Sequence, residues 1–218
     1  MDHPIQLIVE DDLQRTRLTV FFRALLAIPH LIWIWLWGIV AAVAVIVAWV
    51  AALFTTRVPD GLHDFLARYL RYQVHVWAYI TLTADPFPGF GGAEGTYPID
   101  LRVAAAAEQS RLTVFFRLIL ALPAAILSGV LNYLSAAVAF FAWFVCLALG
   151  RIPEGMRNLQ AFSIRYHAQT QAYEYLLTER YPSLNVGLQT WAARRSRPAR
   201  ESGTRRPSRR RARRRTRR

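Results

Sequence analysis

The segment from Leu31 to Phe54 constrains the fold of this chain more than any other part of the sequence. Its 24 residues, LIWIWLWGIVAAVAVIVAWVAALF, include no charged side chain. As an α-helix the segment is about 36 Å long, and the hydrocarbon core of a bilayer is about 30 Å thick. A second uncharged run covers Leu118–Leu149. Since a water-soluble fold would have to bury both runs on every side, the sequence predicts an all-α membrane protein in which each run is a transmembrane helix.

The body of the chain is a tandem duplication in which the second copy follows the first by 94 positions. RLTVFFR at Arg17–Arg23 recurs at Arg111–Arg117, and RVPDG at Arg57–Gly61 recurs as RIPEG at Arg151–Gly155. Seven identical residues in register with a second matching motif are a strong repeat signal. The sequence therefore predicts two membrane repeat units.

The boundaries of these units follow from the repeat and from composition. The first unit, residues 1–96, ends in the Pro- and Gly-rich linker Asp85–Tyr97, and the second unit occupies residues 97–193. Residues 194–218 contain 14 arginines and one acidic residue, so the net charge of +13 belongs to this segment. Such a composition predicts a disordered Arg-rich tail.

Each unit is expected to contain the same elements in the same order. A short strand with alternating apolar residues leads in, at Pro4–Val9 and Pro98–Val103. An interfacial helix carrying RLTVFFR follows, then a kink at Pro29 or Pro123, the long transmembrane helix, and a second amphipathic or membrane helix. We expect the two helices of a unit to form a hairpin, with both RLTVFFR segments on the same side of the membrane. The mostly apolar part of the second helix, Tyr72–Ala84, is nevertheless short for a full crossing.

These motifs resemble the domain-of-unknown-function family 4389 of bacterial membrane proteins. The likeness rests on both RLTVFFR segments, on Pro29 and Pro123, on the RVPDG and RIPEG turns, and on the closing DPFPGF and ERYPSL segments. It covers nearly all of residues 4–184. The resemblance implies a multi-helix membrane protein and supplies no activity.

A polar stripe runs along the second helix of each unit, with its members three or four residues apart. In the first unit the stripe consists of Arg68, Arg71, Tyr72, His75 and Tyr79, and in the second of Arg165, Tyr166, Gln169 and Tyr173. Ionisable groups at membrane depth usually mark a pathway or a binding site. Pseudo-symmetric helices would then bring Arg71 and Arg165 together around an anionic lipid head group. Alternatively, these arginines extend to lipid phosphates while the tyrosines lie at the membrane interface.

Two further arginines, Arg23 and Arg117, interrupt apolar sequence, so each requires an anionic partner. We expect lipid phosphate as the first choice and an Asp or Glu of the same chain as the second. The candidate residues for binding an anionic head group are therefore Arg23, Arg71, Tyr72, His75, Arg117, Arg165 and Tyr166.

Neither a catalytic site nor a cofactor or metal site is expected. Ser128 and Ser163 lack a nucleophile-elbow context, the Cys146 thiol lies in an apolar run where it should be inert, and the histidines have no ligand spacing. The leading hypothesis is a non-enzymatic, lipid-interacting scaffold or accessory subunit. A small transporter or anionic-lipid-binding module that uses the Arg/Tyr stripe is the first alternative.

The Arg-rich tail suggests a second alternative, a membrane tether for nucleic acid. Arginines near a membrane surface contribute about 1 kcal/mol each with anionic lipid, and free basic tails also bind nucleic-acid phosphates. Because a tethered tail meets lipid at high effective concentration, we expect membrane lipids, chiefly anionic, as partners, ahead of nucleic acid. A protein partner or a second copy is a further expectation. Positive charge after the last membrane helix predicts a cytoplasmic tail on a multi-pass protein of the bacterial cytoplasmic membrane.

Overall fold

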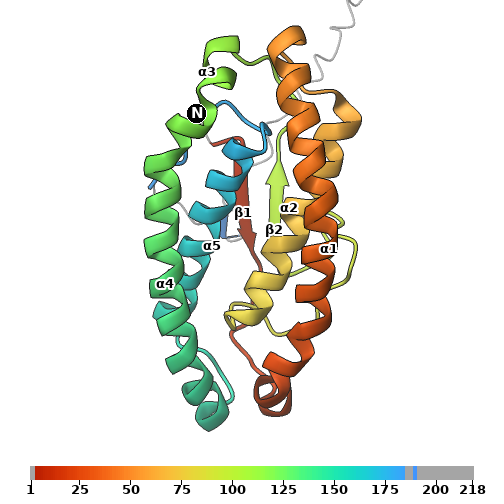
Figure 1. Cartoon of the computed structure of the whole chain (residues 1–218). Helices are drawn as coiled ribbons and strands as arrows, with labels where there is room; N and C mark the ends of the chain where they lie inside the picture. Colours follow the sequence, from red (N-terminus) through yellow and green to blue (C-terminus); the bar gives the residue numbers. More distant parts are fainter. Residues whose placement is uncertain (1–2, 185–188, 191–218) are drawn as a thin grey trace, which may run out of the picture.

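A computed structural model describes residues 3–184 and 189–190 of the chain. Two long helices, α1 (Arg17–Thr55) and α4 (Arg117–Leu149), lie on the outside, and the shorter α2 (Asp60–Ile80) and α5 (Glu154–Glu174) lie between them (Figure 1). A sheet of β1 (Ile5–Val9), β2 (Ile99–Val103) and β3 (Gln189–Thr190) packs on α2 and α5. The molecule therefore has three layers: two long helices, two shorter helices and a sheet.

The RVPDG and RIPEG motifs turn the chain between the two helices of each unit. The residue just before each motif adopts a left-handed backbone, Thr56 with φ 61° and Gly150 with φ 67°, and this conformation ends α1 and α4. Pro59 and Pro153 then stand at the N-caps of α2 and α5. A proline whose φ is already fixed suits the start of a helix, so the motif both ends one helix and begins the next.

The expectation of a separate interfacial helix is wrong for the first unit. Its RLTVFFR segment forms the first turns of α1, and Pro29 lies inside that continuous helix. Val20, Arg23 and Ala27 are buried on the same stripe that continues farther along α1, so packing holds the segment and the span in one helix. The second unit is closer to the expectation, because a short helix α3 (Arg111–Phe115) precedes α4 and only Phe116 separates them.

Strands β1 and β2 pair antiparallel in a register that reflects the repeat. The pairs are Ile5 with Val103, Leu7 with Leu101, and Val9 with Ile99. Leu7 and Leu101 are equivalent positions of the two units, so a pseudo-two-fold axis passes through the central pair. This axis also exchanges the strands between units: β2 packs on α2, and β1 packs on α5.

Reciprocal contacts place the start of each long helix beside the end of the other. Arg17 Nη2 donates to Ala148 O at 2.9 Å, and the equivalent Arg111 Nη2 donates to Phe54 O at 3.1 Å. Thus α1 and α4 run in opposite directions (Figure 1). The two RLTVFFR segments therefore lie at opposite ends of the helix pair, and the expectation that they share one side is wrong. The reason is that β2 runs in the same direction as α1, so the second unit begins at the end where α1 finishes (Figure 1).

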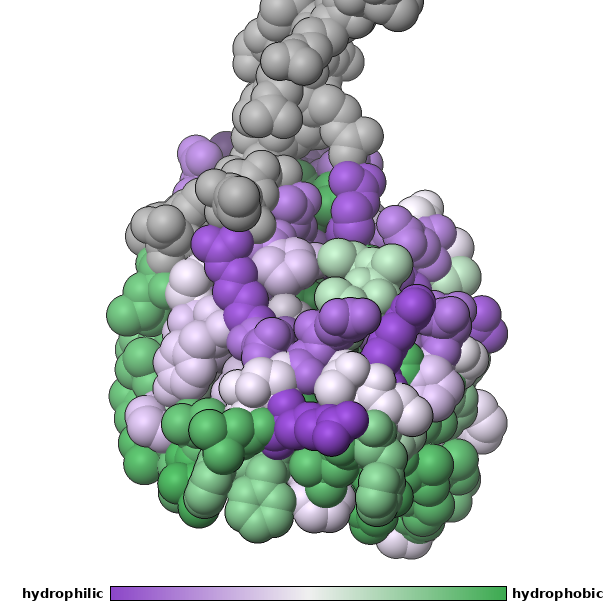
Figure 2. Space-filling view, turned by 90° about the horizontal axis from the view of Figure 1, so that it is seen from above, coloured by the Kyte–Doolittle hydropathy of each residue, from purple (hydrophilic) through white to green (hydrophobic). Residues whose placement is uncertain are grey.

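Exposed large apolar side chains lie almost entirely on α1, α3 and α4. They run along α1 from Leu18 (69% exposed) to Phe54 (76% exposed), and along α3 and α4 from Leu112 to Leu149. Among the described residues, none lies on α2, α5, β1 or β2. Seen from above, hydrophobic residues gather along one part of the rim, away from the hydrophilic surface (Figure 2). The molecule therefore has one apolar side.

By length and composition, α1 and α4 are each able to cross a membrane. In both helices, only 17% of the most apolar 18-residue stretch is buried inside the protein. The core helix of a soluble protein would be buried over most of its length. Most of the apolar surface of α1 and α4 is instead exposed on the outside of the protein.

Candidate functional site

Arg23 is buried, and its hydrogen-bond acceptors belong to the same chain. Its Nη1 donates to Tyr79 O at 2.8 Å and to Ala84 O at 3.0 Å, and its Nη2 lies 2.8 Å from Asp85 Oδ1. The guanidinium also lies 4.4 Å from the centre of the Tyr79 ring. The cation thus holds the carbonyl end of α2 in place, with a carboxylate of the same chain as its anionic partner.

The second unit repeats this arrangement around Arg117, which is 1% exposed. Nη1 donates to Tyr173 O at 2.7 Å and to Thr178 O at 2.8 Å, and the guanidinium lies 4.4 Å from the centre of the Tyr173 ring. Nη2 donates to Gln109 Oε1 at 2.6 Å. Arg23 and Arg117 therefore secure the ends of α2 and α5 by the same geometry.

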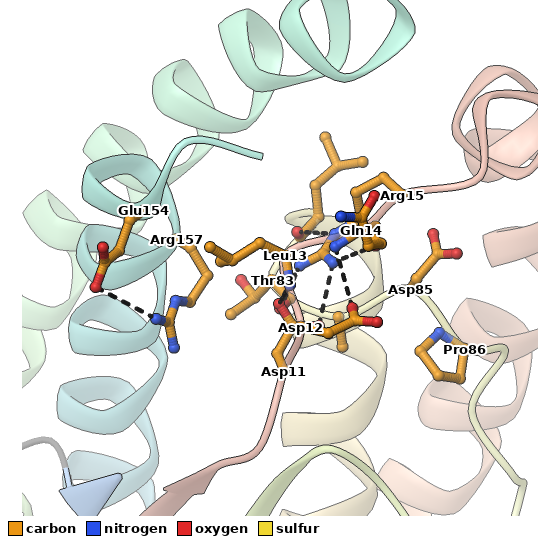
Figure 3. A network of polar contacts seen from close by, with 12 residues as sticks. Asp11, Asp12, Leu13, Gln14, Arg15, Thr83, Asp85, Pro86, Glu154 and Arg157 are labelled. Atoms are coloured by element: carbon orange, nitrogen blue, oxygen red, sulfur yellow. Dashed lines mark hydrogen bonds and ion pairs between the residues drawn. The ribbon is translucent and has the colours of Figure 1, made fainter. Parts of the chain in front are cut away.

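A third buried arginine, Arg15, occurs only in the first unit, where it joins the chain before α1 to the segment after α2 (Figure 3). Its Nη2 lies 2.7 Å from Asp11 Oδ2, and its Nε donates to Leu82 O at 2.8 Å. In the second unit Gln109 takes its place and donates to Leu176 O at 2.7 Å. These contacts hold the segments after α2 and α5 against the starts of the long helices.

Arg71 and His75 of the polar stripe turn toward β2. Arg71 Nε donates to Leu101 O at 2.8 Å and covers a carbonyl on the free edge of this strand. The Nη2 atom of Arg71 lies 3.3 Å from Glu94 Oε2, and His75 Nε2 lies 2.9 Å from Asp100 Oδ1. Burial disfavours ionisation of Asp100, but hydrogen bonds from His75 and from the Gly95 and Leu101 amides outweigh it and lower the pKa of this carboxyl.

The other stripe residues are also buried. Tyr72 OH lies 2.7 Å from His30 Nδ1, and Tyr166 is 3% exposed. Arg165 has no hydrogen-bond partner for Nε or Nη2 among the described residues, and its guanidinium lies 5.4 Å from the centre of the Phe162 ring. Within the part of the chain that the structure describes, Arg71 and Arg165 share no partner. The seven candidate head-group residues are thus all buried, and the structure divides them among separate contacts.

Polar side chains also join α4 to α5. Ser128 Oγ lies 2.7 Å from His167 Nδ1, and Ser135 Oγ donates to the Gln160 amide oxygen. No carboxylate of the described residues bonds to His167, so this Ser–His pair lacks the third group that orients the base of a catalytic triad. The pair therefore acts as an interhelical hydrogen bond.

An open groove lies between α1, α2 and the linker. Its volume is about 680 Å³, within the usual range for ligand pockets. We call it the Trp33 groove. It is lined by aromatic and aliphatic side chains with one cation and one anion: Trp33, Leu36, Trp37, Val40, Gly61, Asp64, Phe65, Arg68, Phe90 and Gly91.

The aromatic wall of the Trp33 groove is held from behind. The Trp37 ring stacks on Tyr72 with centroids 5.5 Å apart, and Trp33 Nε1 donates to Phe90 O at 3.2 Å. Arg68 was part of the predicted polar stripe, but the groove as a whole was not predicted. One available signal was the departure from the repeat, since Asn158 and Phe162 replace Asp64 and Arg68 in the second unit.

The comparisons with known proteins agree with the two-unit organisation. The family model described as Domain of unknown function (DUF4389) matches residues 17–91 and again residues 111–184, together more than half of the chain. No curated protein and no solved structure matches the chain.

Proposed function

Because the chain belongs to the DUF4389 family, a domain of unknown function, we propose its role from the geometry of its surface. The protein is a membrane-embedded, non-enzymatic, lipid-interacting scaffold or accessory subunit. Lipid covers the outer side of α1, α3 and α4. The observation that carries this proposal is that, among the described residues, nearly all exposed large apolar side chains belong to these three helices.

The opposite side suits protein or water better than lipid. Strands β1 and β2 run alongside the helices (Figure 1), and Arg102 of β2 and Glu94 of the linker have half-exposed side chains. Charged groups and open sheet edges are not found in contact with acyl chains. A one-sided membrane surface of this kind favours a subunit whose sheet side meets a protein partner or a second copy.

In the proposed orientation α1 and α4 cross the bilayer in opposite directions, as an inverted pair. The protein is then a multi-pass protein, and we place it in the bacterial cytoplasmic membrane with its tail in the cytoplasm. The tail itself, residues 194–218, lies outside the described residues. Its proposed partner is anionic lipid rather than nucleic acid.

A transporter built on the Arg/Tyr stripe has less support. Within the stripe, Arg71 has partners in the chain, and buried Arg165 shares none of them, so the described stripe residues do not gather two cations around one anion. A catalytic role lacks support too, because no carboxylate of the described residues orients the Ser128–His167 pair.

Alkaline carbonate extraction of membranes that contain the full chain tests the proposal. The protein should stay in the membrane pellet, because stripping the surface of a bilayer does not release embedded apolar helices. Recovery of a folded, monodisperse protein in the aqueous fraction would contradict membrane embedding. The non-enzymatic part would fail if the purified protein converted a labelled phospholipid into a new product and His167→Ala abolished that conversion.

A further inference from the structure

We propose that the Trp33 groove binds one phospholipid with a zwitterionic head group, with the phosphate at Arg68 and the ammonium at Asp64. This inference rests on the proposed function, since it requires that the protein contact lipid. The acyl chain lies along the apolar wall that α1 contributes. The head group lies against the first turns of α2.

The shape of the groove suits a single amphiphile. Trp33, Leu36 and Val40 follow one another at helical spacing on α1 and form a continuous apolar strip. Phe65 and Phe90 extend this strip on the α2 and linker sides. The polar residues of the groove belong to α2, so one wall is apolar and the other carries both charges.

The two charges of the groove are available to a ligand. Arg68 is exposed and forms no ion pair or side-chain hydrogen bond within the described part of the chain. The Asp64 side chain is 79% exposed, and the nearest basic group is His63 Nδ1 at 3.7 Å. Asp64 and Arg68 are one helical turn apart and face the same groove.

Charge complementarity selects the kind of head group. A phosphate at Arg68 gains a charge-assisted hydrogen bond, and an ammonium group beside that phosphate meets the Asp64 carboxylate. A purely anionic head group would gain the first contact but would also face the carboxylate. The pair of residues therefore favours a head group with both charges over one with negative charge alone.

The linker wall of the groove is preorganised by Gly92. This residue has φ +57°, and a Cβ placed there would clash with Arg68 O and lie 3.0 Å from Tyr72 Cβ. Only glycine allows the linker to approach α2 this closely. The approach fixes the linker beside Arg68, so little ordering has to accompany ligand binding.

The second unit indicates that these groove residues are not needed for the hairpin to fold. Leu127 and Leu131 replace the two indoles, and Asn158 and Phe162 replace the two charged residues, yet α4 and α5 form the same hairpin. The indoles and charges of the first unit are therefore free to serve binding.

Competitive lipid binding to the purified full chain in detergent tests this inference. The probes are phosphatidylethanolamine and phosphatidylglycerol with brominated acyl chains, which quench tryptophan fluorescence on contact. We expect the wild type to bind phosphatidylethanolamine about tenfold more tightly than phosphatidylglycerol, as one charge-assisted contact allows. Asp64→Asn should reduce this preference, and Asp64→Asn with Arg68→Phe, which copies the second unit, should abolish it.

The matched control is Asp60→Asn with Arg57→Phe. These residues form an exposed ion pair at 2.7 Å outside the groove, so the control makes the same chemical changes at the start of the same helix. It should retain the wild-type preference. Free phosphoethanolamine should compete weakly because it lacks the acyl chain.

Two outcomes would overturn the inference while leaving the proposed function intact. One is a carbonate-resistant wild type that binds phosphatidylglycerol at least as well as phosphatidylethanolamine. The other is a groove variant that binds both lipids as the control does. Loss of the wild type from the membrane pellet would instead refute the proposed function itself.

Discussion

Replacing Arg117 by methionine should destabilise the protein strongly and leave lipid binding in the Trp33 groove unchanged. Methionine keeps most of the apolar volume but cannot donate to the Tyr173 and Thr178 carbonyls or to the Gln109 side chain. The three acceptors are then left without this donor in a region where Arg117 itself is 1% exposed. Arg23→Met should behave similarly, because Arg23 has the same geometry.

The magnitude follows from these contacts. A hydrogen bond from a charged donor contributes about 1.5 kcal/mol net, so three of them amount to roughly 4.5 kcal/mol. Part of this is offset because methionine carries no charge that must be desolvated on folding. We therefore expect Arg117→Met to lower the free energy of unfolding by about 3 kcal/mol, equivalent to a fall in Tm of about 10 °C for a chain of this size.

Thermal unfolding in detergent, followed by tryptophan fluorescence, measures this loss. Arg111→Met is the matched control, since Arg111 belongs to the same RLTVFFR motif but is exposed and donates to Phe54 O alone among the described residues. The control should lose about 1 kcal/mol or less. The reasoning would be refuted if both variants unfolded within about 2 °C of each other while Arg117→Met alone lost lipid binding, because lipid phosphate would then be the partner of Arg117.

Three further predictions concern the sheet, the linker and the contact between the repeats. The lowered pKa of Asp100 contributes stability above its unfolded value of 3.8, and this contribution is lost as pH falls toward the folded value. Asp100→Asn should therefore lower Tm at pH 7, and the difference from wild type should shrink below about pH 4; an unchanged difference at about pH 3 would contradict it. Gly92→Ala should lower the free energy of unfolding by about 2 kcal/mol or more, because Gly92 has a positive φ and close neighbours. Gly89→Ala, where an added Cβ would meet nothing within 4 Å, should be nearly neutral when its thermal unfolding is measured in the same way. Trp49 Nε1 donates to Val114 O at 3.0 Å, and Trp143 Nε1 donates to the equivalent Val20 O at 2.9 Å. Trp49→Phe and Trp143→Phe should therefore each lower the free energy of unfolding by about 1 kcal/mol, and unequal losses would refute the pseudo-symmetry.

Much of the architecture could be predicted from the sequence because the repeat and the apolar runs are long signals. The two lead-in strands, the long helices and the helix-ending turns at RVPDG and RIPEG all occur where they were expected. The direction of the second unit was predicted wrongly, because both RLTVFFR segments were expected on the same side. It depends on the pairing of β1 with β2, and strand pairing across 94 residues leaves no local pattern in the sequence.

The role of the arginines was also beyond sequence reasoning. Arg23 and Arg117 interrupt apolar sequence, which predicted an anionic partner for each. Arg23 pairs with Asp85, whereas the acceptors of Arg117 among the described residues are neutral. The sequence could not reveal that backbone carbonyls at the ends of α2 and α5 would accept most of their hydrogen bonds. A lipid phosphate and a helix end offer the same kind of acceptor, so only the three-dimensional arrangement distinguishes them.

Site-specific labelling of cysteines in sealed vesicles tests the inverted arrangement most directly. Asp60→Cys and Glu154→Cys, each in a Cys146→Ala background, mark the starts of α2 and α5, next to the ends of the antiparallel α1 and α4. A membrane-impermeant maleimide should label one of these cysteines only from outside and the other only from inside. Labelling of both from the same side would contradict the account, because α1 and α4 would then not cross the bilayer in opposite directions.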